Sequence, residues 1–247
     1  LGDLINAGEG DNVVIGDDAA IDYVRFERGG ATPGADTNAA DIDVITSLST
    51  TLNGGADKIT MGNGNDIVIG GRDGDTITAG AGRNLVVGDS GTVTAANEDL
   101  NRFGTQPITV GRIETIEFGD GGIDTITTLG GNDVVLGGHL GDLINAGDGD
   151  NVVIGDDAAI DYVRVERGGA TPGADTNAAD IDFITSLSTT AAGGSDTITT
   201  GNGNDIIVGG RSGDTINAGN GNNIVVGDSA EIIAANSDDS RFGTQAI

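Results

Sequence analysis

Acidic and amide side chains recur every nine residues in the stretch 52–87, and each stands two residues before an apolar residue: Asp57, Asp66, Asp75 and Asn84, followed by Ile59, Val68, Ile77 and Val86. Glycine-rich segments separate these residues, so backbone carbonyls are available beside each carboxylate. Carboxylate and carbonyl oxygens form an all-oxygen ligand set, which suits calcium rather than zinc or copper. The pattern therefore predicts periodic sites for a hard divalent cation.

The element that positions each carboxylate is a nine-residue unit, called a nonad here, such as 70–78 with the sequence G-G-R-D-G-D-T-I-T. Its first six positions predict a glycine-rich turn whose last residue supplies the carboxylate. Positions 7 to 9 predict a short strand, in which the middle side chain points one way and its two neighbours point the other.

Composition restricts the possible partners. The chain has 45 glycines in 247 residues without a triplet period, so collagen is excluded. A formal net charge of −28 argues against nucleic acid or an anionic membrane surface as partner. No apolar run reaches the length of about 18 residues that spans a membrane, and cysteine is absent. Multivalent cations are the expected means of neutralising the charge.

Internal repetition dominates the chain. Residues 140–164 repeat residues 1–25 with one difference, Glu9 against Asp148, at an offset of 140 − 1 = 139 residues. We expect a fragment of a long repetitive protein and one continuous solenoid of four units. Their bounds are 1–51 (nonads to 15, insertion 16–51), 52–118 (nonads 52–87, insertion 88–118), 119–190 (nonads 119–154, insertion 155–190) and 191–247 (nonads 191–226, insertion 227–247).

The insertions have their own pattern. In 155–190, the segments "AAIDYVRVE" and "DIDFITSLST" predict two strands around a loop rich in Gly and Pro. In 88–118, "GTVTA" and "ITVGRIETIEF" predict another pair. No segment has a helical period of adequate length, so the sequence predicts an all-β protein.

The nonads resemble the RTX (repeats-in-toxin) family, whose repeat is G-G-x-G-x-D-x-U-x with U apolar. Several consecutive nonads in phase carry this resemblance. It implies a parallel β-roll, a β-solenoid with two nonads per 18-residue coil and several calcium ions held between stacked turns on each side.

The resemblance also implies the metal ligands. Position 6 gives same-side partners two nonads apart, and two carboxylates one strand spacing apart repel each other unless a cation lies between them. The pairs are Asp57 with Asp75, Asp66 with Asn84, Asp124 with Asp142, Asp133 with Asn151, Asp196 with Asp214, and Asp205 with Asn223, and Asp3 and Asn12 belong to the first set.

The fourth nonad of every set departs from the family pattern, with Asn at position 6 and Gly-Asp directly after its strand. We interpret the Asn as the end of the calcium ladder. The Gly-Asp carboxylates, Asp17, Asp89, Asp156 and Asp228, would then serve the last site on the opposite side.

Second and fourth nonads have strands that are apolar on both faces, such as I-V-I and L-V-V, whereas first and third nonads flank the middle residue with polar side chains. A parallel sheet that is apolar on both faces is expected to be covered. Either the inserted strands or another chain would cover it. We expect a possible interface for self-association into a fibre or layer at Ile67, Ile69, Leu85, Val87, Val134, Leu136, Val152 and Ile154.

These features favour a calcium-stabilised structural segment of a secreted or cell-surface protein, such as an adhesin stalk, a surface-layer component or an extracellular filament. The alternative is a calcium-binding folding and secretion roll of a type I-secreted toxin, protease or lipase. Ice binding is a third possibility, but its turns "TTGNGND" do not recur from turn to turn. We expect no enzyme activity, because periodic carboxylates are more economically explained as calcium ligands.

Overall fold

The computed structural model describes residues 2–23, 40–48, 54–96, 102–163, 180–188, 193–234 and 247, and all statements below concern these residues. Within these ranges the regular structure consists of 21 β-strands without any helix, and so contains no helix that could cross a membrane. The predicted all-β class is confirmed.

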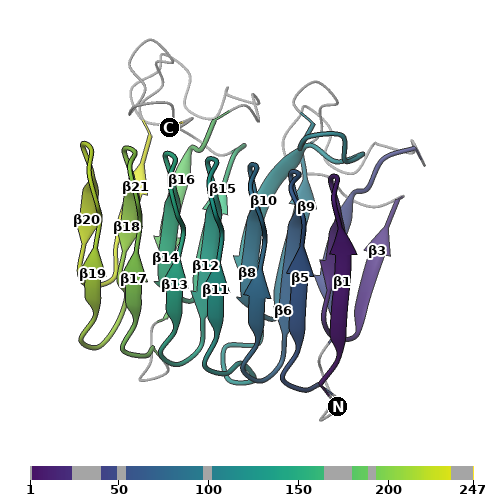
Figure 1. Ribbon diagram of the computed structural model, residues 1–247, viewed down its shortest axis with the longest axis horizontal. Coiled ribbons are helices and arrows are strands. Elements are labelled where there is room, and N and C mark those ends of the chain that lie inside the picture. Colours follow the sequence, from purple (N-terminus) through teal and green to yellow (C-terminus); the bar gives the residue numbers. More distant parts are fainter. Residues whose placement is uncertain are drawn as a thin grey trace.

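Two seven-stranded parallel sheets form the roll (Figure 1). The odd sheet is built from first and third nonads and comprises, in spatial order, β1 (Leu4–Gly8), β5 (Lys58–Met61), β7 (Thr76–Thr78), β11 (Thr125–Thr127), β13 (Leu143–Asn145), β17 (Thr197–Thr199) and β19 (Thr215–Asn217). The even sheet is built from second and fourth nonads and comprises β2 (Val13–Ile15), β6 (Ile67–Gly71), β8 (Leu85–Asp89), β12 (Val134–Gly138), β14 (Val152–Asp156), β18 (Ile206–Val208) and β20 (Ile224–Val226).

The core of the roll consists of the middle residues of the nonad strands. Ile59 of the odd sheet pairs in register with Ile77, and Val68 of the even sheet pairs with Val86. All four side chains are fully buried and belong to one apolar cluster between the two sheets. The predicted alternation within each strand, with the middle side chain inward, is therefore confirmed.

The inserted segments form a third sheet, called the cover sheet here. Its strands are antiparallel and follow the order β21 (Glu231–Ile233), β16 (Phe183–Ser186), β15 (Ala158–Asp161), β10 (Val110–Thr115), β9 (Gly91–Ala95), β4 (Val44–Ser47) and β3 (Ala19–Asp22). The strands predicted in 88–118 and 155–190 are present, although residues 97–101 and 164–179 lie outside the described ranges.

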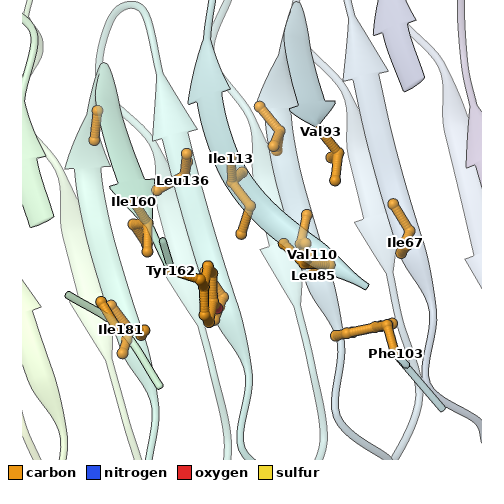
Figure 2. Packing of buried hydrophobic residues seen from close by; sticks show 14 of the residues in the cluster. Ile67, Leu85, Val93, Phe103, Val110, Ile113, Leu136, Ile160, Tyr162 and Ile181 are labelled. Carbon is orange, nitrogen blue, oxygen red and sulfur yellow. The ribbon is translucent and has the colours of Figure 1, made fainter. Parts of the chain in front are cut away.

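The cover sheet packs on the outward face of the even sheet. Figure 2 shows this second apolar layer, in which Ile67, Leu85 and Leu136 of the even sheet share one cluster with Val93, Ile113 and Ile160 of the cover sheet. Removing such side chains from water contributes roughly 1.5–3 kcal/mol each. The molecule is thus a three-layer structure with the even sheet in the middle.

This arrangement corrects the predicted interface. Every one of its eight residues is at most 5% exposed inside the single chain: Ile67, Ile69, Leu85, Val87, Val134, Leu136, Val152 and Ile154. The inserted strands, rather than a neighbouring chain, cover the apolar face: within the described residues a strand pair follows each of the first three sets of nonads, and β21 follows the fourth. These residues are therefore not available to a second chain, and self-association stays a prediction without this surface.

Candidate calcium sites

The turns that enter the strands of the odd sheet stack an aspartate at every level, and we call this row the aspartate edge. Its members are Asp3, Asp57, Asp75, Asp124, Asp142, Asp196 and Asp214. Each carboxylate Oδ1 accepts the backbone N–H of the preceding aspartate in the row, at distances of 2.5, 2.7, 2.6, 2.8, 2.7 and 2.9 Å in that order. One oxygen of each carboxylate from Asp57 to Asp214 thus fixes the stacking of the turns.

The second oxygen of each of these carboxylates, Oδ2, accepts no hydrogen bond of this ladder. Within the described residues, the buried Oδ2 atoms lack a hydrogen-bond partner in Asp57, Asp75, Asp124, Asp142, Asp196 and Asp214. A buried acceptor without a donor costs about 1–3 kcal/mol, and more when it is charged. This regular row of unpartnered oxygens is what a cation would satisfy.

Glycines leave space beside these oxygens. A Cβ placed on Gly70 would lie 2.3 Å from Asp75 Oδ2, and one on Gly88 would lie 2.1 Å from Asp124 Oδ2 and 2.4 Å from the carbonyl oxygen of Gly137. The absence of a side chain therefore leaves each carboxylate facing backbone carbonyls. Within the described ranges no three His, Cys, Asp or Glu side chains cluster together, so a cation here would draw the rest of its shell from carbonyls.

Burial and like charges act together on these carboxylates. Burial, aided by the charges of Asp124 and Asp57, raises the pKa of Asp75 to about 8. Burial, aided by the charge of Asp124, raises the pKa of Asp142 to about 10. Burial also raises the pKa of both Asp124 and Asp196 to about 7. Without a cation the row is therefore costly to ionise at neutral pH, and a divalent cation would offset that cost.

The opposite turns, which lead from the odd sheet to the even sheet, form a row that we call the mixed edge. It strictly alternates amide and acid, in the order Asn12, Asp66, Asn84, Asp133, Asn151, Asp205 and Asn223. The same ladder links its members, at 2.9, 3.2, 2.7, 3.0, 2.9 and 2.8 Å. The Oδ2 atoms of Asp66 and Asp133 lack a partner, whereas Asp205 Oδ2 accepts the Thr200 hydroxyl at 2.8 Å.

The hydrogen bonds of the two edges bring together all six predicted same-side pairs. They also show that the row does not end at Asn, contrary to the prediction. Asn84 donates its backbone N–H to Asp133 of the next set, and Asn151 donates to Asp205. The row continues because each insertion leaves the roll and returns one level further along. Sequence reasoning missed these pairs, although joining the nonad sets end to end would have revealed them.

The Gly-Asp residues occupy a different environment from the one predicted. Asp89 accepts the backbone N–H of Gly122 through Oδ1 at 3.0 Å and that of His139 through Oδ2. Asp156 likewise accepts backbone N–H groups of Gly194 and Arg211. These two aspartates thus join turns of the first and third nonads of the next set, and their role as calcium ligands stays a prediction.

The Gly-Asp residues of the first and last sets, Asp17 and Asp228, share this environment only in part. Asp17 Oδ2 accepts the backbone N–H of Arg72 at 2.6 Å, as in the two central cases. Asp228 lies beside Gly210, Arg211, Ser212 and Ser229 in an open pocket. The anchoring role thus recurs at the three described junctions between sets.

Comparison with known proteins supports this picture. The family model of the RTX calcium-binding nonapeptide repeat (4 copies) matches residues 60–94, 118–139 and 190–225, which include strands of both sheets of the roll. No curated protein and no solved structure matched the chain. Stacked parallel turns, a row of unpartnered carboxylate oxygens and this family match together identify RTX calcium-binding nonapeptide repeats in the chain.

Proposed function

We propose that this chain is a calcium-stabilised structural segment of a secreted or cell-surface RTX protein, such as an adhesin stalk, a surface-layer component or an extracellular filament. One observation carries the proposal: the odd and even sheets run through seven levels without a break, although three complete insertions and part of a fourth lie along them. A roll that continues across every insertion adds length with each repeat. The units 52–118 and 119–190 are the proposed repeating elements of that array.

Calcium would act as the cross-link between levels. At the aspartate edge, successive turns are joined by one hydrogen bond from a backbone N–H to a carboxylate Oδ1, and the Oδ2 of that carboxylate has no partner. An ion between two levels would neutralise the repulsion and hold the turns together. The proposed ligands are the carboxylates of this edge and those of Asp66, Asp133 and Asp205.

We further propose that the segment is no enzyme and that it works outside the cell. Its buried carboxylates are used repetitively for stacking, which leaves them little role in acid–base chemistry. Calcium sites of extracellular modules bind at about 10⁻⁴–10⁻³ M, concentrations that the cytosol lacks. The chain would therefore cross the cytosol unfolded and fold after export.

The test removes one 139-residue period from the parent protein and measures both secretion and the length of the surface structure. A structural array predicts normal secretion, detection on unpermeabilised cells and a shorter projection by electron microscopy. Loss of secreted, folded protein with no change of length would instead support the folding and secretion roll of a toxin, protease or lipase.

A further inference from the structure

The asparagine turns of the mixed edge differ from its aspartate turns in sequence. All four have the pattern A-G-x-G-x-N, at 7–12, 79–84, 146–151 and 218–223, whereas the aspartate turns begin with Met61, Thr128 or Thr200. The alternation of the two kinds of turn along the edge is complete. A pattern this regular indicates that the amide has a role of its own.

The side-chain amide closes each of these turns from inside. Asn84 Nδ2 donates to the carbonyl oxygens of Gly80 and Gly82, at 3.4 and 3.1 Å, and Asn151 Nδ2 donates to those of Gly147 and Gly149, at 3.4 and 2.9 Å. Asn12 makes the same pair of contacts with Gly8 and Gly10, at 3.3 and 2.6 Å. Asn223 Nδ2 donates to the Ala218 carbonyl oxygen at 2.7 Å. A neutral donor thus satisfies carbonyls of these turns, of which those of Gly8, Gly80 and Gly147 also accept a backbone N–H from the next level.

The hydrogen-bond network fixes which end of each amide faces the turn. Asn84 Oδ1 accepts the backbone N–H of Asp66 at 3.2 Å, and Asn151 Oδ1 accepts that of Asp133 at 3.0 Å. Rotating the amide by half a turn would set its NH₂ group against a backbone N–H and its oxygen against two carbonyls. The donor therefore points into the turn.

The backbone of the asparagine turns is shaped for this contact. The glycine at the second position of the turn has a left-handed φ of 46° at Gly80 and 62° at Gly147, a conformation that side chains rarely adopt. The residues at the same position of the aspartate turns, Gly62, Leu129 and Gly201, are not in this region. In the aspartate turns, the atom that corresponds to Nδ2 is Oδ2, which has no partner in Asp66 and Asp133 and accepts the Thr200 hydroxyl in Asp205. One kind of turn has a donor at this position, and the other has an acceptor.

We infer that the side-chain amides of Asn12, Asn84, Asn151 and Asn223 take the place of a calcium ion in their turns. The inference rests on the proposed role of the carboxylates as calcium ligands. Calcium then binds along the whole aspartate edge but only at the aspartate turns of the mixed edge. The two edges of the roll differ in calcium load, and every second turn of the mixed edge needs no ion.

The test is the double variant Asn84→Asp/Asn151→Asp in the full chain, with the outward-facing Asn145→Asp as a control that adds charge on the odd sheet. Calcium binding is measured by isothermal titration and folding by circular dichroism. We expect the double variant to bind additional calcium, ~1 ion per substituted turn, and to need several-fold more calcium for half-folding. A folded double variant with the stoichiometry of the unmodified chain would overturn the inference.

A second measurement applies if the double variant does not fold. In the unmodified chain with calcium, side-chain NH₂ protons of Asn84 and Asn151 should exchange slowly with solvent by NMR, since they donate to carbonyls in a buried turn. Rapid exchange would contradict the inference. If the unmodified chain bound no calcium at all, the proposed function would fail, whereas slow exchange of these amide protons would still establish the closed turns.

Discussion

Asp75 and Asp124 stand 49 residues apart in the chain yet occupy successive levels of the aspartate edge, where the backbone N–H of Asp75 donates to Asp124 Oδ1 at 2.6 Å. Between them the chain completes the set of nonads and makes two strands of the cover sheet, β9 and β10. The roll then resumes at the next level. This contact makes one ladder out of separate sets of nonads.

Neutralising one member of that ladder should remove calcium without removing the stacking bond. Asp124→Asn keeps an acceptor for the Asp75 N–H but loses the charge, so we expect ~1 calcium ion fewer per chain and a higher calcium requirement for folding. Isothermal titration measures both. Asp73→Asn is the matched control, because Asp73 is exposed and its left-handed φ of 62° suits Asn. Equal losses in the two variants would show that Asp124 has no special role.

Filling the space beside a carboxylate should have a similar effect. A Cβ on Gly88 would lie 2.1 Å from Asp124 Oδ2, so Gly88→Ala is expected to raise the calcium concentration needed for half-folding several-fold. Gly227 follows the last described even strand at the same nonad position, with nothing within 4 Å of its Cβ direction. Gly227→Ala should therefore leave the calcium titration by circular dichroism unchanged, and an equal effect in both variants would argue against the proposed cation space.

Acid should partly replace calcium. In the roll without cations, burial raises the pKa of Asp75 to about 8 and those of Asp124 and Asp196 to about 7, above the ordinary 3.8. A raised pKa favours the protonated, folded form, so this stabilisation is present below about pH 4 and is lost as the pH rises towards 7–8. Circular dichroism in calcium-depleted buffer should show more β structure at pH 4 than at pH 8. The opposite order would contradict this assignment.

The cover sheet should matter for stability rather than for assembly. Leu85 is 1% exposed between the even and cover sheets, whereas Leu143 on the outward face of the odd sheet is 49% exposed. Leu85→Ala should lower the free energy of unfolding in saturating calcium by about 2–5 kcal/mol, and Leu143→Ala should change it much less. Urea denaturation measures both. If Leu85→Ala left stability unchanged, the cover sheet would not pack as described.

Much of the roll follows from the sequence. The nine-residue period determines which residues form strands, and the 18-residue register that pairs Ile59 with Ile77 is two periods. The pairing of Asp57 with Asp75 follows from the same arithmetic. The odd and even sheets were predictable because T-I-T and L-V-V differ in the polarity of their flanking residues.

Other relationships could not be read from local pattern. The contact of Asp75 with Asp124 depends on an insertion returning to the next level, which composition does not encode. Asp89 carries the same carboxylate as the ladder residues, but backbone amides from two distant turns surround it. The amide contacts of Asn84 depend on a turn conformation that the glycine at position 80 permits and that its sequence alone does not reveal.

The central claim is that calcium completes this fold, since a chain with net charge −28 buries a row of carboxylates with one oxygen unpartnered on each. Far-ultraviolet circular dichroism of the full chain at neutral pH, in excess chelator and then in calcium at millimolar concentration, tests it most directly. We predict a disordered spectrum in chelator and a cooperative change to a β spectrum at about 10⁻⁴–10⁻³ M calcium. A complete β spectrum in chelator, unchanged by calcium, would contradict the account.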